Sequence, residues 1–274
     1  MRSHPGLTFS SSDLGFAARI EAAEAANGIA MAESVRDLIP ESACRAFAGG
    51  VAIFAGPNSP MTHALGIGML RAVPNEELVA MEQFFFDRSC DCSVDLCPLA
   101  DPSVLAFFQN RPYRVSEFNN VLVRQITPED DFSPNPRARL AHIEEMQEWG
   151  RLVNRGFAEI MPPTDATAEL LATTCSTARC WFVDDELEPA GGGAMTIKED
   201  VAMFLGDAVL ASSRRKGLHC ELIRARLAEA QKQDVRLAMV SVLPGSTSHR
   251  NYERLGFQLV YMRVNLVRQF NRAD

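Results

Sequence analysis

Apolar positions in the second half of the chain alternate between the spacing of strands and that of helices. The run Val201–Leu210 is mostly apolar and predicts a buried strand. After a short polar loop, apolar residues recur at helical spacing from Gly217 to about Lys232, which predicts a helix with one buried face. Val235–Val242 predicts a second strand, and Pro244-Gly245-Ser246 opens a short helix that ends before Phe257.

The other segments predict a mixture of helices and strands. In the first half we expect helices near residues 14–27, 31–39, 75–88 and 101–110, and strands near 50–55, 64–69, 93–96 and 117–126. Before residue 201 we expect helices at 137–157 and 164–172 and a hairpin of strands at 180–183 and 190–197. The triple glycine at 191–193 has no following helix or lysine at phosphate-loop distance, so it predicts a flexible strand or a bulge.

The two halves repeat the same order of elements. Val121–Ile126 matches Asn265–Phe270, and Arg111–Tyr113 matches Leu255–Phe257, each pair at an offset of 144 residues. We infer a duplication of one α/β unit. The predicted fold class is therefore α/β (α+β), with two tandem copies that each have a mixed central sheet flanked by helices.

The loop between the strand and the long helix is cationic. Arg214, Arg215 and Lys216 precede Gly217 at the point where the helix begins. The unpaired N–H groups and the positive dipole end of a helix start suit phosphate oxygens, and glycine lets the backbone approach them. A solvated cationic loop is the commoner explanation of such a motif taken alone. In the first copy the same place, Val73–Glu77, carries carboxylates, so we expect an anion at the second copy alone.

Two motifs in this half together resemble the GNAT superfamily of acyl-CoA-dependent N-acyltransferases. Arg214, Gly217 and His219 fall on the pattern R-x-x-G-x-(G/A) at a strand-to-helix junction. The segment Tyr252–Phe257 matches the pattern Y-x-x-x-G-F at the end of the following helix. His219 departs from the family pattern, which has glycine or alanine there, so its side chain could crowd the cofactor pyrophosphate or bond to it.

The resemblance implies a tandem GNAT layout with a degenerate first copy. We expect a degenerate GNAT-like domain at residues 1–127, an acidic, proline-rich linker at 128–136 and an acetyl-CoA-binding GNAT domain at 137–274. Phe108 occupies the place of Tyr252 at the 144-residue offset, so the first copy lacks that hydroxyl.

The resemblance also implies a cofactor site and two catalytic residues. The implied cofactor-binding residues are Val209 and Leu210, through their backbone, and Arg214, Arg215, Lys216, Gly217, Leu218 and His219 at the loop and helix start. Tyr252 is the candidate acid for the departing thiolate, with a half-buried structural tyrosine as the alternative. Asp207 is the candidate base, directly or through a water; a strand-end ion pair is the alternative, and Glu199 or Asp200 could serve instead.

These features predict an N-acetyltransferase that moves an acetyl group from acetyl-CoA, its co-substrate, to a primary amine by direct attack in a ternary complex. An amine is mostly ammonium at neutral pH and must lose a proton before it attacks a thioester. The acceptor is expected to be a small molecule. A non-catalytic acyl-CoA-binding regulatory or scaffold protein, and transfer to a hydroxyl or a protein amino group, stay open as alternatives.

Composition narrows the class of protein. The 274 residues carry 27 basic and 35 acidic side chains, a net charge of −8, which disfavours a nucleic-acid surface and is compatible with a cationic amine. The sequence of residues 1–13 lacks the apolar core of a signal peptide, and no apolar run reaches the length of a membrane span. We therefore expect a cytoplasmic protein, a monomer or homodimer, with no membrane partner.

Seven cysteines, an odd number in a long chain, favour reduced thiols over a disulfide framework. Cys90, Cys92 and Cys97 lack a second ligand pair at zinc-like spacing, so we expect buried structural thiols and no metal site.

Overall fold

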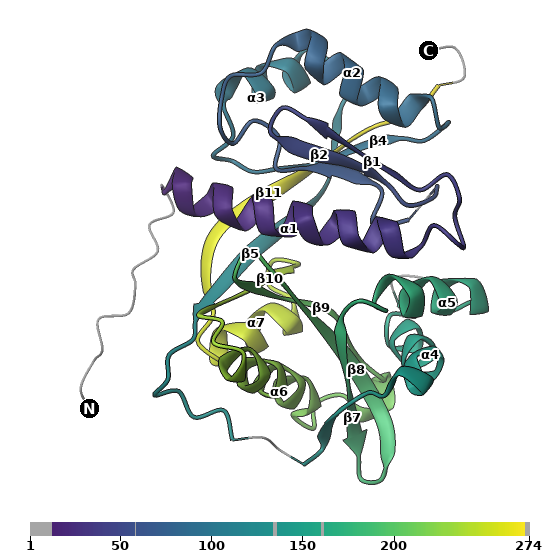
Figure 1. The fold of residues 1–274 in the computed structure, drawn as a ribbon, viewed down its shortest axis with the longest axis vertical. Helices are drawn as coiled ribbons and strands as arrows, with labels where there is room; N and C mark the ends of the chain where they lie inside the picture. The colour runs from purple at the N-terminus through teal and green to yellow at the C-terminus, as the bar shows by residue number, and fades with distance from the viewer. Residues whose placement is uncertain (1–12, 58, 134–135, 160–161, 272–274) are drawn as a thin grey trace. The chain divides into compact units, whose positions relative to one another are not determined.

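The computed structural model describes residues 13–57, 59–133, 136–159 and 162–271. The expectation for the amino-terminal segment, apart from Asp13, and that for residues 134–135 of the linker lie outside these residues. The chain forms two compact units (Figure 1): unit 1 comprises the residues up to 121 together with those from 259 onward, and unit 2 comprises residues 122–258. Packing defines these units, whereas the repeat defines the predicted domain boundaries, which stay a prediction.

Unit 1 is built on a mixed sheet with the strand order β1-β2-β3-β4-β11. Strands β3 and β4 are parallel, and the other neighbours in this series are antiparallel. Its elements are α1 (Leu14–Ser34), β1 (Ala43–Phe47), β2 (Gly50–Phe54), β3 (His63–Leu65), α2 (Asn75–Phe86), β4 (Cys92–Leu96), α3 (Pro102–Gln109), the first part of β5 (Arg114–Gln125) and nearly all of β11 (Gln258–Arg268). Its core includes three consecutive buried phenylalanines at the end of α2, Phe84, Phe85 and Phe86.

The first helix is longer than the sequence pattern predicted. We expected two helices, at 14–27 and 31–39, but α1 is continuous from Leu14 to Ser34. Asp13 caps its start by accepting a hydrogen bond from the Phe16 N–H at 2.9 Å. Gly28 does not break the helix because it packs against the sheet: a Cβ added there would lie 2.4 Å from Cδ1 of Ile53. Tertiary packing thus overrides the weak helix propensity of glycine.

Unit 2 has the strand order β10-β9-β8-β7-β6, with β9 and β10 parallel and the other neighbours antiparallel. Its elements are β6 (Ala138–Leu140), the 3-10 turn η1 (Ile143–Glu145), α4 (Met146–Gly156), α5 (Asp165–Thr174), β7 (Arg179–Asp185), β8 (Glu188–Lys198), β9 (Val201–Val209), the 3-10 turn η2 (Ala211–Ser213), α6 (Leu218–Lys232), β10 (Leu237–Val242) and α7 (Thr247–Arg254). Helices α6 and α7 lie on one face of this sheet and α4 and α5 on the other (Figure 1).

The predicted helix at 137–157 was wrong over residues 137–145, which precede α4. Residues 138–140 form β6, which pairs with β7, and the helix α4 begins at Met146. The change of structure falls where Glu145 Oε2 accepts a hydrogen bond from the His142 N–H at 2.8 Å and one from Arg139 Nη1 at 2.9 Å. These contacts stop the strand and start the helix, which a run of helical spacing could not reveal.

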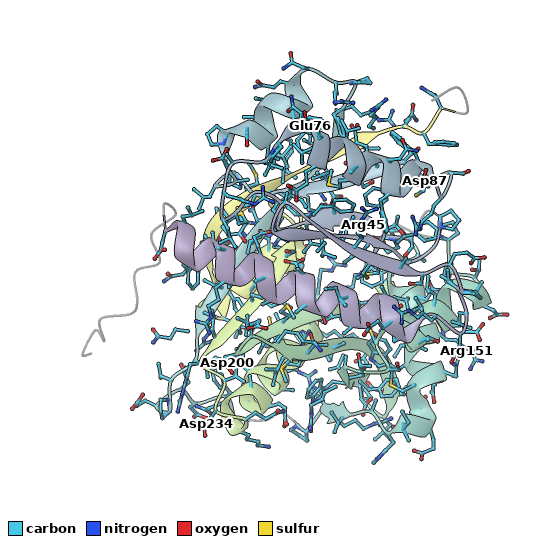
Figure 2. The ribbon with its side chains drawn as sticks, turned by 45° about the horizontal axis from the view of Figure 1, so that its top comes forward. Arg45, Glu76, Asp87, Arg151, Asp200 and Asp234 are labelled. Atoms are coloured by element: carbon cyan, nitrogen blue, oxygen red, sulfur yellow. The ribbon has the colours of Figure 1, made fainter. Side chains whose placement is uncertain are left out.

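The repeat is visible in the positions of the elements. Strand β5 begins at residue 114 and β11 at residue 258, 144 residues later, and α2 and α3 of unit 1 take the places of α6 and α7 in unit 2. Both units have exposed charged side chains, such as Glu76 and Asp234, which are labelled in Figure 2. No helix in the described parts of the chain has the length and apolar character needed to cross a bilayer.

Candidate functional site

Strand β9 contains a bulge that sets the direction of Asp207. Gly192 of β8 pairs with Ala208, but Ala194 pairs with Leu205, so β9 holds one extra residue between these pairs. Gly206 lies in this bulge with a φ of 67°, a left-handed conformation that glycine adopts without strain.

The bulge reverses which side chains face the helix α6. Before it, Phe204 packs in the core under α6, while Leu205 packs on the side of Trp149 in α4. Simple alternation would place Asp207 on the same side as Leu205. The extra residue moves Ala208 to the Trp149 side and turns Asp207 toward α6 and α7, where its carboxylate meets the side chains described next.

Three side chains contact the Asp207 carboxylate, one as an ion pair and two through hydrogen bonds. Arg226 of α6 lies with Nη1 2.5 Å from Oδ1, His219 of α6 lies with Nε2 3.1 Å from Oδ2, and the Tyr252 hydroxyl of α7 donates to Oδ2. The side chain of Arg226 is fully buried and Asp207 is 10% exposed. Arg226 also donates to the carbonyl of Ala194 at 3.0 Å, so this is an ion pair with additional hydrogen bonds.

The tautomer of His219 follows from its neighbours. Arg254 Nη1 donates to Asn251 Oδ1 at 2.9 Å, which turns the amide nitrogen of Asn251 toward His219. That nitrogen lies 3.0 Å from His219 Nδ1. Nδ1 therefore accepts, and Nε2 carries the proton that is donated to Asp207.

These contacts change the acidity of two groups. Burial alone would raise the pKa of Asp207, but the charge of Arg226 and the hydrogen bond from His219 hold that pKa well below its usual range. Burial and the adjacent carboxylate of Asp207 raise the pKa of Tyr252 well above its usual value. Asp207 is thus a carboxylate, and Tyr252 a neutral phenol with 0% exposure.

The triple glycine makes room for this network. A Cβ added to Gly193 would lie 2.6 Å from Oδ1 of Asp207 and 3.1 Å from Cζ of Arg226. At Gly192 it would lie 2.7 Å from Nε1 of Trp149. The expected strand or bulge is confirmed, since β8 runs through all three glycines opposite the bulge in β9.

The cationic loop leads from β9 into α6, as predicted. Gly217 is the N-cap of α6 with φ of 83°. Arg214 Nη1 lies 2.8 Å from Glu159 Oε1, and Lys216 Nζ lies 2.6 Å from Asp185 Oδ2. Two of the three predicted phosphate-binding cations therefore pair with carboxylates here. Arg215 is exposed, with φ of 64°.

The backbone expected to hold the pantetheine arm lies beside this loop. Strands β9 and β10 pair at Ala202 with Ala238 and at Met203 with Met239, whereas β9 continues to Val209. The Leu210 N–H donates to the carbonyl of Ala190 at 2.8 Å, and the Val209 carbonyl accepts from Arg214 Nε at 3.2 Å.

The structure brings Asp207, His219 and Tyr252 together and places the loop residues next to them. Glu199 and Asp200, the alternative bases, are exposed in the turn before β9. Sequence reasoning missed Arg226 and Asn251. Arg226 had a signal, because it lies four residues after Leu222, on the apolar face of the predicted helix.

The cysteines predicted to be structural are buried or half-buried free thiols. Burial raises the pKa of Cys92 and of Cys97 to about 12, so both are neutral thiols in this structure. The described residues contain no group of three or more histidine, cysteine or acidic side chains arranged to hold a metal.

No protein-family model matches this chain, and no curated protein matches it. Its structure is similar to several solved structures. A GCN5-related N-acetyltransferase from Kribbella flavida is 19% identical, with a TM-score of 0.61 over 92% of this chain and 95% of that chain. A tandem GNAT protein from the clavulanic acid biosynthesis pathway is 16% identical, with a TM-score of 0.60 over 97% and 98%.

A GCN5-related N-acetyltransferase from Sphaerobacter thermophilus is 16% identical, with a TM-score of 0.56 over 72% of this chain and 67% of that chain. At these identities the likeness concerns the fold. The protein has a tandem GNAT fold with a mixed α/β architecture, which confirms the predicted fold class.

Proposed function

We propose that the protein is an acetyl-CoA-dependent N-acetyltransferase whose second unit holds the cofactor. The observation that carries this proposal is the junction at Gly217: a cationic loop begins α6 next to the bulged strand whose Asp207 meets Tyr252. The loop would thus bind the pyrophosphate, and the adjacent Asp207 and Tyr252 would act on the thioester.

In this proposal, the start of α6 binds the pyrophosphate. Arg214, Arg215 and Lys216 supply positive charge, and the backbone N–H groups from Gly217 to His219 supply donors at the positive end of the helix dipole. The ring of His219 is held by Asp207 and Asn251, so we assign its contribution to the backbone and not to the imidazole. The phosphates would displace Glu159 and Asp185 from the cations that they now pair with.

The proposed reaction joins the amine nitrogen to the thioester carbonyl carbon and breaks the bond from that carbon to sulfur. Tyr252 gives a proton to the thiolate, and Asp207 takes one from the amine, directly or through a water. A carboxylate that is paired with a guanidinium and accepts two hydrogen bonds is a weak base. We therefore infer that Asp207 becomes effective when Tyr252 turns its O–H from Asp207 toward the bound sulfur.

A non-catalytic acyl-CoA-binding protein is the second candidate. The observation that favours it is the complete burial of Tyr252, whose hydroxyl is engaged by Asp207 and Arg226. If this network does not open, cofactor binds at the loop but no proton reaches the sulfur.

Release of free CoA thiol in the presence of a panel of small primary amines tests the two candidates. The proposal expects turnover by the wild type, a loss of about 10²–10⁴-fold in Tyr252→Phe, and no such loss in the matched control Tyr113→Phe. Acetyl-CoA should bind Tyr252→Phe as it binds the wild type. Equal turnover in Tyr252→Phe would contradict the assigned role, and binding without turnover on any amine would favour the binding protein.

A further inference from the structure

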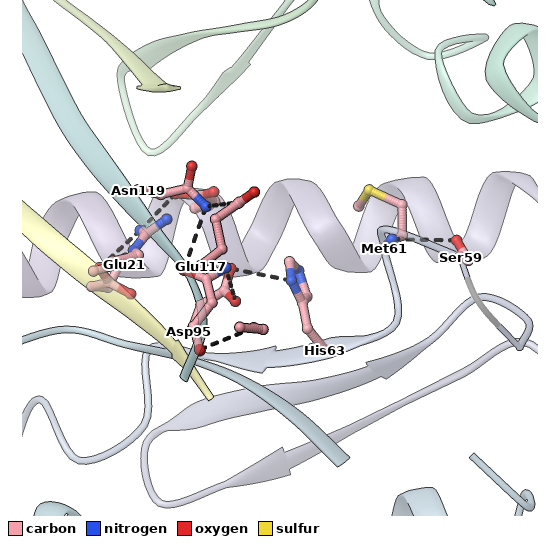
Figure 3. Close-up of polar contacts among 11 residues, drawn as sticks. Glu21, Ser59, Met61, His63, Asp95, Glu117 and Asn119 are labelled. Atoms are coloured by element: carbon pink, nitrogen blue, oxygen red, sulfur yellow. Dashed lines mark hydrogen bonds and ion pairs between the residues drawn. The ribbon is translucent and has the colours of Figure 1, made fainter. Parts of the chain in front are cut away.

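Unit 1 contains two clusters of ion pairs, and they differ in how far solvent reaches them. The first contains the ion pair of His63 with Asp95, both labelled in Figure 3. It also contains Glu21 and Arg263, whose side chains are each 1% exposed, so this second pair is out of reach of a ligand. The other cluster is centred on Glu82 of α2 and borders a cavity.

Two arginines share the carboxylate of Glu82. Arg111, just after α3, lies with Nη1 2.8 Å from Glu82 Oε2, and Arg268, at the end of β11, lies with Nη1 3.0 Å from the same oxygen. The Glu82 side chain is 3% exposed, whereas those of Arg111 and Arg268 are 30% and 15% exposed. Two positive charges thus meet one negative charge, and solvent reaches the positive groups.

Aromatic rings hold both guanidinium groups in place. Cζ of Arg111 lies 4.2 Å from the ring centroid of Phe107, and Cζ of Arg268 lies 5.0 Å from that of Phe86. The contact with Glu82 uses Nη1 of Arg111, and no described residue accepts from its Nε or Nη2. These two nitrogens form one edge of the planar fork, the geometry that binds a carboxylate through two parallel hydrogen bonds.

Arg111 and Arg268 both line a cavity of about 520 Å³. The rest of its wall comes from the start of α2, the end of α3 and the segment after it: Asn75, Ala106, Phe107, Asn110 and Pro112. These five residues are uncharged, so the described lining includes no acidic side chain. Such a wall matches a ligand with an anionic head and a small apolar body.

We propose that this cavity binds a small organic monocarboxylate, with Arg111 and Arg268 as the groups that recognise the carboxylate. One negative charge balances the excess of the two arginines over Glu82. A phosphate group fits less well, because Glu76 follows Asn75 in the first turn of α2 and repels further negative charge.

This site differs from the place where the first copy was expected to bind no anion. That expectation concerned the start of α2, whereas the arginines meet Glu82 about two turns further along the helix. The site lies in unit 1 and does not rest on the acetyl transfer proposed for unit 2.

Calorimetric titration without acyl-CoA, in a buffer free of carboxylate and phosphate, tests the site with benzoate and its neutral analogue benzamide. We expect saturable binding of benzoate to the wild type and binding of benzamide weaker by about tenfold or more, the difference of charge-assisted hydrogen bonds. Inorganic phosphate, which has no apolar body, should bind more weakly than benzoate.

Arg111→Gln should weaken benzoate binding about tenfold or more. Glu82 keeps Arg268 as its partner in this variant, so no buried charge is left uncompensated. Arg114→Gln is the matched control, because it removes the same charge from an exposed position outside the wall and should leave benzoate binding unaltered.

Ala106→Phe provides a second variant, because it narrows the cavity from an exposed position of α3 and leaves both arginines in place. It should weaken benzoate binding, whereas Leu105→Phe, an exposed change outside the wall, should not. The proposal would be overturned by absence of saturable benzoate binding to the wild type, by equal binding of benzamide or phosphate, or by undiminished benzoate binding in Arg111→Gln or Ala106→Phe.

Discussion

The guanidinium of Arg226 and the carboxylate of Asp207 form a buried ion pair, 2.5 Å from Nη1 to Oδ1, on the face of β9 that a bulge exposes to α6. Phe204 lies beneath the guanidinium, with its ring centroid 4.6 Å from Cζ. The pair thus joins the strand, the helix and the aromatic core of unit 2.

Removing one partner of this pair should lower the free energy of unfolding more than removing both partners. Arg226→Met leaves Asp207 charged and buried, so we expect a loss of about 3–5 kcal/mol in the free energy of unfolding. The double variant Arg226→Met/Asp207→Asn should recover part of that loss, because no uncompensated charge stays buried. Urea unfolding of the single and double variants measures the difference, and additive losses would contradict the coupling.

The Asp207 carboxylate should also make the free energy of unfolding depend on pH in the acidic range. The folded-state pKa of Asp207 lies below its unfolded value, so its contribution is present above the unfolded pKa and is lost as pH falls through the folded one. The stability gap between the wild type and Asp207→Asn should therefore shrink as pH falls below about 4. Unfolding curves at several acidic pH values measure this gap, and a gap independent of pH would contradict the assignment.

Gly193 should resist substitution because of this network. Alanine there would press its Cβ against Oδ1 of Asp207 at 2.6 Å, and we expect a loss of about 1–3 kcal/mol from overpacking. Gly15→Ala is the matched control: it lies in the first turn of α1, where the added Cβ would be an ordinary 3.5 Å from Oδ1 of Asp13. Thermal unfolding should separate the two variants, and equal stability would mean that the strands shift to accept the methyl group.

His63 should give unit 1 the opposite pH dependence. Burial lowers the pKa of His63, but the Asp95 carboxylate outweighs it, so the folded pKa lies above the unfolded value. Its contribution is full below about pH 6.5 and is lost as pH rises through the folded pKa. Stability measured from pH 5.5 to 8.5 should decline less in His63→Gln and in Asp95→Asn than in the wild type. If both variants lose as much stability as the wild type over this pH range, the loss arises from other groups.

Much of this fold was predictable because its signals are local. The strand, loop and helix around Gly217 follow from apolar spacing and from one glycine, and they occur as predicted. The start of α4 was not predictable in this way, since it depends on the contacts of Glu145 with Arg139 and His142 and on the pairing of β6 with β7.

The sequence predicted some residues of the site but not their geometry. Asp207 and Tyr252 were singled out, yet their direct hydrogen bond requires the Gly206 bulge, which turns a side chain to the opposite face of the sheet. Alternation in the sequence carries no mark of such a shift. The role of Arg226 likewise depends on contacts between residues far apart in the chain.

The central claim is that the loop before α6 holds acetyl-CoA, and a calorimetric titration with that cofactor tests it most directly. The variants are Arg214→Glu/Lys216→Glu in the loop before α6 and, as a matched control, Lys232→Glu/Arg236→Glu, which reverses one exposed charge in the last turn of α6 and one beyond it. The account predicts that the wild type and the control bind and that the loop variant does not. Failure of the wild type to bind, or equal binding by all three proteins, would contradict it.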